Sequence, residues 1–307
     1  MLDIHSLKNQ LDSRFVSVII PVFNDRDRLE LCLCALEQQT YPRDLYEVIV
    51  VDNASDEDIK SVAGQFQQTF TVYENCRGSY TARNKGISVA KGEIIAFTDS
   101  DCIPAKNWLE TGIRYLLSVP NCGLAAGRIQ FFFKDPYRPT SVEIFDSMIN
   151  LQQEKYVTEN NFGATANLFT FKQIFEDIGF FNSDLKSGGD VEWGLRVSAQ
   201  GYSLLYAEES CVAHPTRYSL RQLAKKIIRQ TGGAYDNDKD NKPKLIRLAK
   251  CLYELKPPLR SAFRKAFLKW DLKRTEQRIK LFFVIIFAHY VKRIEEIRLL
   301  LGGKSKG

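Results

Sequence analysis

The N-terminal third of the chain alternates short apolar runs with helical patterns, and each apolar run ends on polar residues. The runs cover residues 16–20, 46–51 and 93–98, with a weaker one at 70–72. A strand buried on both faces has such a continuous apolar run, and strands that alternate with helices form parallel βαβ units. The pattern predicts an α/β fold around a mostly parallel sheet. Ligands of such sheets bind at the carboxyl ends of the strands, so the polar ends predict a crevice of nucleotide size.

Two carboxylates, Asp99 and Asp101, follow the run at 93–98 and are separated by one serine. They can reach one small site if the chain turns there, and neighbouring carboxylates repel each other unless a cation lies between them. Oxygen ligands of this kind suit Mg²⁺ or Mn²⁺, which commonly join protein carboxylates to a substrate diphosphate. The alternative is that Asp-Ser-Asp only forms a turn before the next helix, where these residue types are common.

The composition fits a globular enzyme with an extension. The chain has 307 residues, of which 44% are hydrophobic and 26% charged, and these are values of folded globular proteins. Its first residues lack the apolar segment of a signal peptide, and its seven scattered cysteines favour reduced thiols over a disulfide framework or a zinc site. We therefore expect a cytoplasmic protein. Neither a GxGxxG fingerprint nor a P-loop is present, and the lack of a glycine-rich loop at 16–30 argues against a nucleotidyltransferase.

Six segments, in the same order and spacing, resemble the inverting glycosyltransferases of family 2. They are residues 18–24 (VIIPVFN), 50–56 (VVDNASD), 82–86 (ARNKG), 97–101 (FTDSD), 163–167 (GATAN) and 188–196 (GGDVEWGLR). The resemblance covers about residues 15–235. It implies a nucleotide-binding sandwich of the GT-A type, a nucleotide-sugar donor, a glycan or lipid-linked acceptor, and Mn²⁺ or Mg²⁺ as cofactor. For the donor we expect a UDP-sugar.

The resemblance also implies roles for the residues at the matching positions. The donor nucleotide would be bound by Pro21, Phe23, Asp52, Arg83 and Asp99. The metal would be held by Asp101 as principal ligand, with Asp99 and His214. The acceptor side would include Asn167, Glu192 and Trp193. For His214, a purely structural role is the alternative. The family often has Glu-Asp at the catalytic position, whereas this chain has Gly189-Asp190, which retains the carboxylate assigned as the base.

Asp190 suits the role of general base on chemical grounds as well. The attacking hydroxyl has a very high pKa and needs a positioned carboxylate that takes its proton as the new bond forms. Direct attack with a single base inverts the anomeric centre. Asp190 precedes a helical pattern at 191–197, so the alternative is that it only caps this helix. Glu192 is a weaker candidate for the base, because an acid in a first helical turn also complements the helix dipole.

The C-terminal third is strongly basic. Residues 215–307 carry 24 Lys and Arg against 8 Asp and Glu, whereas residues 1–214 carry 19 against 29. A basic amphipathic helix is predicted at 217–229, a loop at 231–243, a second basic helix at 245–255 and a long helix at about 262–301. We predict three parts: an N-terminal lead (1–14), a GT-A catalytic domain (15–235) and a basic helical extension (236–307).

The apolar stretch at 281–288 lies inside the predicted last helix. It is shorter than the ~20 apolar residues that a membrane-spanning helix needs, and basic residues flank it. It therefore predicts an interfacial helix on the anionic inner face of the cell membrane, which Phe282, Phe283, Ile285, Ile286 and Phe287 would enter. A basic region can also bind nucleic acid, but the aromatic apolar face favours a membrane, and we expect no nucleic-acid partner. A helical hairpin packed on the catalytic domain is the other alternative.

Two functional interpretations remain at this point. The chain is either an active metal-dependent glycosyltransferase or a homologue that binds nucleotide sugars without catalysis. The presence of Asp52, Asp99, Asp101 and Asp190 favours the active enzyme.

Overall fold

The computed structural model describes residues 14–237, 243–269, 272 and 274–306. Apart from its last residue, the predicted N-terminal lead (1–14) lies outside this part of the chain. The described chain forms two compact units. The first, the sheet unit, comprises residues 14–130, 151–184 and 189–214. The second, the helical unit, comprises 131–150, 185–188 and the described residues from 215 onward. The predicted domain limits stay predictions.

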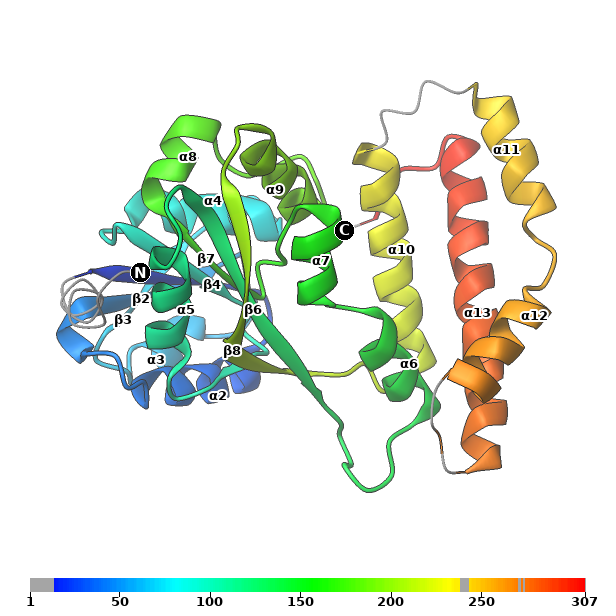
Figure 1. Cartoon of the computed structure of the whole chain (residues 1–307), viewed down its shortest axis with the longest axis horizontal. Coiled ribbons are helices and arrows are strands. Elements are labelled where there is room, and N and C mark those ends of the chain that lie inside the picture. Colours follow the sequence, from blue (N-terminus) through cyan, green and yellow to red (C-terminus); the bar gives the residue numbers. More distant parts are fainter. Residues whose placement is uncertain (1–13, 238–242, 270–271, 273, 307) are drawn as a thin grey trace. The chain divides into compact units, whose positions relative to one another are not determined.

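The sheet unit is built around one curled sheet with the strand order β3-β2-β1-β4-β7-β6-β8-β5 (Figure 1). Its strands are β1 (Val16–Val22), β2 (Tyr46–Asp52), β3 (Thr69–Tyr73), β4 (Ile94–Thr98), β5 (Ile103–Pro104), β6 (Cys122–Phe132), β7 (Asn167–Phe171) and β8 (Ser203–Pro215). The pairs β3–β2, β2–β1 and β1–β4 are parallel, whereas β7 pairs antiparallel with β4 and β6, and β5 with β8. The predicted α/β fold is confirmed, and its parallel strands are the four apolar runs of the sequence.

Helices cover both faces of this sheet. They are α2 (Arg26–Glu37), α3 (Ile59–Ala63), α4 (Ser79–Val89), α5 (Trp108–Leu117), α7 (Gln153–Asn160), α8 (Lys172–Ile178) and α9 (Gly189–Ala199), with a short 3₁₀ turn, η1 (Arg43–Leu45). The even-numbered apolar residues of β1 share a core with Leu29 and Leu33 of α2. Ile19 points to the other face, where Gly86 of α4 lies so close that an added Cβ would be 2.4 Å from Ile19 Cγ2.

The helical unit packs its helices side by side, and α13 contacts α6, α10, α11 and α12 (Figure 1). They are α6 (Ser141–Ile149), α10 (Leu220–Asn237), α11 (Lys244–Tyr253), α12 (Leu259–Phe263), the π-helical turn η2 (Arg264–Lys269) and α13 (Thr275–Leu300). Their core contains Phe145, Leu223, Leu281 and Ile285. The apolar stretch at 281–288 thus contributes much of the core of this unit.

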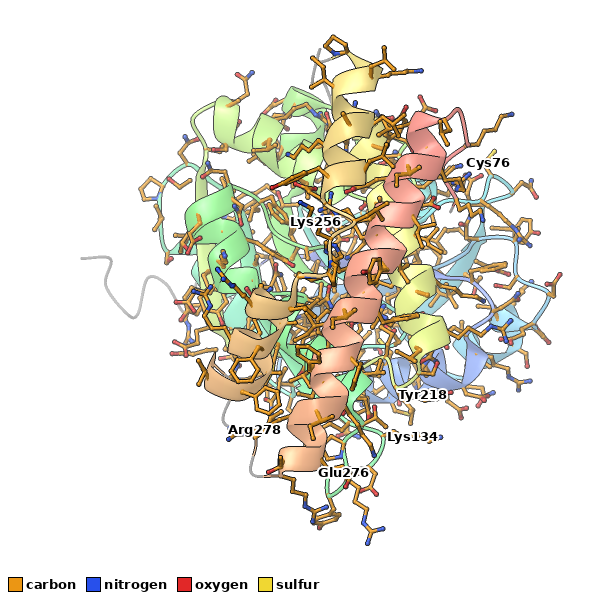
Figure 2. The ribbon with its side chains drawn as sticks, turned by 90° about the vertical axis from the view of Figure 1, so that its right-hand side faces the viewer. Cys76, Lys134, Tyr218, Lys256, Glu276 and Arg278 are labelled. Carbon is orange, nitrogen blue, oxygen red and sulfur yellow. The ribbon has the colours of Figure 1, made fainter. Side chains whose placement is uncertain are left out.

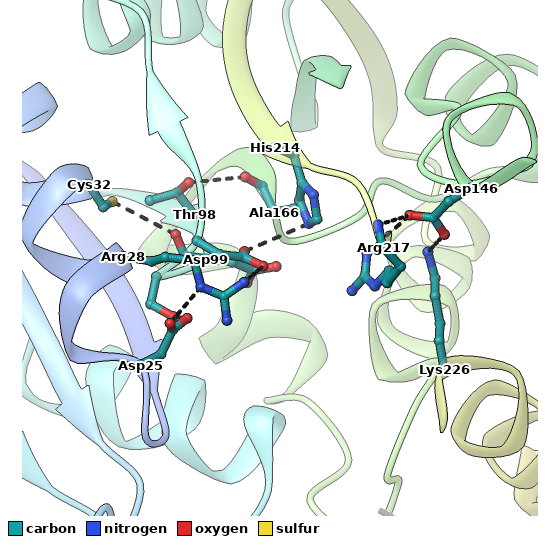
Figure 3. Close-up of polar contacts among 12 residues, drawn as sticks. Asp25, Arg28, Cys32, Thr98, Asp99, Asp146, Ala166, His214, Arg217 and Lys226 are labelled. Atoms are coloured by element: carbon teal, nitrogen blue, oxygen red, sulfur yellow. Dashed lines mark hydrogen bonds and ion pairs between the residues drawn. The ribbon is translucent and has the colours of Figure 1, made fainter. Parts of the chain in front are cut away.

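A buried ion cluster lies within the helical unit. Asp146 is fully buried, and its carboxylate accepts hydrogen bonds from Lys226 Nζ at 3.0 Å and Asn150 Nδ2 at 2.8 Å. Arg217 Nη1 lies 3.7 Å from the same carboxylate (Figure 3). Burial lowers the pKa of Lys226 to about 8, and the Arg217 charge adds to this effect. The cluster ties α6 to α10, because breaking a buried ion pair leaves an uncompensated charge.

Two sequence predictions about the C-terminal region are wrong. The predicted loop at 231–243 is helical as far as Asn237, because Gly232 and Gly233 continue α10, and residues 238–242 lie outside the described part. The predicted long helix at 262–301 is divided: α12 and η2 precede α13, which begins at Thr275. Among the described residues, no helix combines the length and the apolar character needed to cross a bilayer.

Candidate active site

Asp99 follows β4 directly and forms an ion pair with a buried arginine of α4. Arg83 Nη2 donates to Asp99 Oδ1 at 2.5 Å, and the Arg83 side chain is 5% exposed while that of Asp99 is 33% exposed. The end of β4 is anchored by Thr98, whose hydroxyl donates to the carbonyl of Ala166 at 3.1 Å. The structure therefore brings Asp99 and Arg83 together, and the accessible part of Asp99 can contact a ligand.

Asp101 lies between two basic side chains. Its Oδ1 is 3.7 Å from Nε2 of His214, at the end of β8, and its Oδ2 is 3.5 Å from Nη1 of Arg28 on α2. The side chain of His214 is 4% exposed. The sequence placed Asp101 and His214 more than a hundred positions apart, and the curled sheet brings them into one site.

The Cys102 thiol lies beside Asp101 and His214, and one potential ligand atom from each of the three lies within 4.8 Å of the others. Burial, with the Asp101 and Asp99 charges, raises the pKa of Cys102 well above its ordinary value. A thiol binds a metal as thiolate, so Cys102 is a poor ligand here. The carboxylate of Asp101 and the imidazole of His214 remain, and such oxygen and nitrogen donors fit Mn²⁺.

Sequence reasoning did not assign Arg28 to the site. Its Nε donates to Asp25 Oδ1 at 2.6 Å (Figure 3), and Ser100 Oγ donates to Asp25 Oδ2 at 3.0 Å. Burial raises the pKa of Asp25, and Arg28 opposes that effect. Arg28 thus links the end of β1 to the Asp99–Asp101 turn. The signal in the sequence was its position three residues after Asp25, which is one turn of a helix.

The ends of β1 and β2 meet on the donor side, because Val22 and Asp52 are partners in the parallel ladder. Asp52 is 9% exposed, and its Oδ1 accepts the backbone N–H of Ser55 at 2.9 Å. Phe23 follows β1 and is 44% exposed, with the guanidinium carbon of Arg77 4.3 Å from its ring centroid. Pro21 lies within β1 and is partly buried. Phe23 therefore offers an aromatic face near the Asp52 carboxylate.

Asp190 is the second residue of α9 and accepts two hydrogen bonds. Tyr80 Oη donates to Asp190 Oδ1 at 3.1 Å, and the amide of Val191 donates to the same oxygen at 3.1 Å. A helix cap would instead reach an amide two or three residues along the chain. Burial raises the pKa of Asp190, while the Arg83 charge and the Tyr80 hydrogen bond partly oppose it.

Arg83 connects Asp190 with the Asp99 side of the site. Its guanidinium carbon lies 5.7 Å from the ring centroid of Tyr80, and its charge acts on the Asp190 carboxylate. Asp190, Tyr80, Arg83 and Asp99 therefore form one continuous polar chain. Tyr80 was not predicted, because nothing in its local pattern distinguishes it from an ordinary buried tyrosine of α4.

Asn167 and Trp193 lie in the core. Asn167 is fully buried, accepts a hydrogen bond from Trp108 Nε1 at 2.8 Å and donates to the carbonyls of Arg128 and Ser210. Trp193 is also fully buried and stacks on Phe175 at 4.7 Å. These contacts give both side chains structural roles, and their assignment to the acceptor side stays a prediction.

Glu192 binds Arg196 one turn further along α9. Arg196 Nε lies 2.9 Å from Glu192 Oε1, and the guanidinium also donates to the carbonyls of Ile178 and Phe180. The pair fixes the segment that follows α8. Glu192 therefore has a structural partner, and the structure favours Asp190 as the base.

The model of Glycosyl transferase family 2 matches residues 17–179 of the chain. A curated relative, Glycosyltransferase AglE of Haloferax volcanii, is 38% identical over 279 residues, which cover 86% of this chain and 87% of the relative. The chain belongs to glycosyl transferase family 2. The family prediction is thus confirmed, and the site described above is that of a family-2 member.

A second curated relative and a solved structure extend this result. The dolichyl N-acetyl-alpha-D-glucosaminyl phosphate 3-beta-D-2,3-diacetamido-2,3-dideoxy-beta-D-glucuronosyltransferase of Methanococcus voltae is 26% identical over 230 residues, covering 71% of this chain and 70% of the relative. Mannosyltransferase PcManGT from Pyrobaculum calidifontis, solved in complex with GDP-Man and Mn²⁺, matches with a TM-score of 0.60 at 20% identity. That match covers 92% of this chain and 87% of PcManGT, and it supports the GT-A type of fold.

Proposed function

We propose that this family-2 member is an inverting glycosyltransferase. It moves a sugar from a nucleotide-diphosphate donor to a hydroxyl of a glycan or lipid-linked acceptor. The observation that carries the proposal is the connection of a carboxylate with a raised pKa, Asp190, through Tyr80 and Arg83 to Asp99 at the end of β4. The name of the Methanococcus voltae relative, which specifies a dolichyl phosphate-linked sugar, supports the lipid-linked class of acceptor.

The donor nucleotide is bound by residues at the ends of β1, β2 and β4. Asp52 accepts hydrogen bonds from the base, and the exposed ring of Phe23 borders it. Asp99 accepts a hydrogen bond from the ribose and is held in place by Arg83, which a buried position makes rigid. The expected UDP-sugar competes with a GDP-sugar, which the structural neighbour binds, and the donor screen below decides between them.

Asp101 and His214 would hold the divalent metal, for which their donor atoms fit. When bound, the metal neutralises the negative charge that develops on the departing diphosphate. Asp101 stands between Arg28 and His214, so the surrounding positive charge keeps its carboxylate in place. Arg28 adds a second positive group to the region where the phosphates of the donor bind.

Asp190 takes the proton from the acceptor hydroxyl as that oxygen attacks the anomeric carbon. A base works best when its pKa lies near the operating pH, and burial moves the pKa of Asp190 upward from the ordinary value of an aspartate. The hydrogen bond from Tyr80 holds one carboxylate oxygen. The other oxygen is thereby oriented for the acceptor.

The basic helical unit associates with an anionic membrane on its cytoplasmic face. Residues 215–307 carry 24 basic against 8 acidic side chains, and each basic residue near such a surface contributes about 1 kcal/mol. Of the residues expected to enter the membrane, Ile285 is 7% exposed and belongs to the core, whereas Phe283 is 62% exposed. The apolar contact is therefore narrower than the sequence predicted.

A donor screen tests the function. Purified protein is incubated with UDP- and GDP-sugars, with and without Mn²⁺, and released nucleotide is measured. We expect metal-stimulated hydrolysis of one donor. Asp190→Asn should keep the affinity for that donor and lose transfer to an acceptor, while Asp184→Asn, an exposed neighbour in sequence, should behave as wild type. Donor binding without turnover in wild type would instead support a non-catalytic binding module.

A further inference from the structure

The helical unit contains a pocket of about 660 Å³ next to the start of α13. Its apolar lining includes Val142 of α6, Val284 and Phe287 of α13, and Leu220 of α10. The volume falls within the ~300–1,000 Å³ that small-molecule sites occupy. Phe283 also lines the pocket and is 62% exposed. The pocket is therefore apolar inside and opens to the surface of the unit.

The rim of this pocket is positively charged. Arg138, Arg274 and Lys280 line it together with one acid, Glu276, at the start of α13 (Figure 2). Lys280 Nζ lies 2.5 Å from Glu276 Oε1, so this pair is neutral and the two arginines supply the net positive charge. An apolar interior with a basic rim complements an amphiphile that has one hydrocarbon chain inside and an anionic group at the mouth.

We propose that this pocket seats one hydrocarbon chain of an anionic membrane phospholipid, with the lipid phosphate at Arg138 and Arg274. A sugar or a nucleotide fits poorly, because its polar groups would lose water against Val142, Val284 and Phe287 without hydrogen-bond partners. The source is a membrane lipid because the whole unit is basic and the exposed Phe283 lies at the mouth. The inference rests on the proposed membrane association.

Binding of a monomeric probe separates the pocket from general adsorption to a membrane. Dodecyl phosphate, kept below its critical micelle concentration, is titrated into the full-length protein by calorimetry, with dodecyl maltoside and inorganic phosphate as comparisons. We expect dodecyl phosphate to bind at least tenfold more tightly than either. Equal binding of dodecyl maltoside would overturn the role of the basic rim, and no binding of dodecyl phosphate would overturn the site.

Variants locate the probe. Ser141→Phe places a large side chain at a pocket-lining position of α6, and the double variant Arg138→Gln/Arg274→Gln removes the rim charge; each should weaken dodecyl phosphate at least tenfold. Phe283→Ser, at an exposed position, tests the site if Ser141→Phe fails to fold. Arg260→Gln, an exposed cation of α12 outside the lining, should bind as wild type. Wild-type affinity in the double variant and in Phe283→Ser would refute the pocket.

Competition identifies the source of the lipid. A short-chain phosphatidylglycerol should displace dodecyl phosphate at least as well as a short polyprenyl phosphate does. A clear preference for the polyprenyl phosphate would overturn the assignment to a membrane phospholipid and identify the pocket as a seat for the acceptor's carrier. Vesicles with and without phosphatidylglycerol measure membrane association separately. Probe binding without vesicle binding would disprove the membrane proposal and leave the amphiphile pocket.

Discussion

The replacement Tyr80→Phe should move the acidic limb of the pH–rate profile to higher pH. Tyr80 is 6% exposed and its hydroxyl donates to Asp190 Oδ1 at 3.1 Å, which lowers the pKa of Asp190 against the opposing effect of burial. The base must be ionised to accept a proton. Without the hydroxyl, the ionised form loses a stabilising partner, so the pKa of Asp190 rises and the base is protonated at a pH where the wild-type base is still active.

The magnitude follows from the bond that is lost. A hydrogen bond to a charged group contributes about 1.5–3 kcal/mol, and about 1.4 kcal/mol corresponds to a tenfold change in a protonation equilibrium. The lower value applies here, because the Val191 amide and the Arg83 charge remain. We expect kcat/KM on the acidic limb to fall about tenfold, while the plateau at higher pH changes little. Burial and the Asp190 charge raise the pKa of Tyr80, so its hydroxyl remains a donor throughout this range.

The assay is kcat/KM for sugar transfer across the pH range at saturating Mn²⁺, since kcat/KM reports ionisations of the free enzyme. The ring of Tyr80 is retained in the variant, so its contact with Phe181, at 5.7 Å between ring centroids, is kept. Tyr156→Phe is the matched control, because this phenol also lies close enough for Asp190 to raise its pKa but interacts with backbone groups of residues 151 and 152. An unmoved acidic limb in Tyr80→Phe, or the same shift in Tyr156→Phe, would refute the reasoning.

Three further predictions concern the metal, the donor and the segment before Asp190. Asp101→Asn should lower Mn²⁺-stimulated turnover by more than a hundredfold, as chelation of the wild type does reversibly; an unchanged Mn²⁺ titration would contradict its role as ligand. Asp52→Ala should raise the KM for the donor more than it lowers kcat, and steady-state kinetics that show a pure kcat defect would disprove base recognition. Gly233→Ala places a methyl carbon 2.4 Å from the carbonyl oxygen of Ser187, which costs about 1–3 kcal/mol of stability and shifts the segment that leads to Asp190. A lower melting temperature together with a lower kcat is expected, and wild-type values of both would show that α10 does not position this segment.

Much of the sheet unit could be predicted from the sequence, because its signals are local. The apolar runs at 16–20, 46–51 and 93–98 are β1, β2 and β4, since a strand covered on both faces needs apolar residues at successive positions. Asp52 and Asp99 could be placed at one edge of the sheet, since parallel strands that start at one edge end together at the other. The antiparallel strands β6 and β8 escaped prediction, because the burial of half of each depends on distant segments.

The partners of the site residues could not be predicted in the same way. Nothing near Tyr80 or Arg28 in the sequence indicates that one donates to Asp190 and the other approaches Asp101. Such contacts join residues 110 and 73 positions apart, and they exist only after the chain has folded. Trp193 illustrates the reverse case, because its motif predicted a place on the acceptor side while its ring stacks on Phe175 in the core.

The sequence by itself therefore determined the parallel half of the sheet, the family and the carboxylates at the strand ends, since each of these depends on residue type and short-range spacing. Tertiary structure alone decided which charges surround Asp190 and Asp101, and that the apolar stretch at 281–288 is largely core. The physical reason is that electrostatics and burial depend on distance in space. An apolar helix face has the same pattern whether it packs against α6 or against a membrane, and only the fold shows which of its side chains are covered.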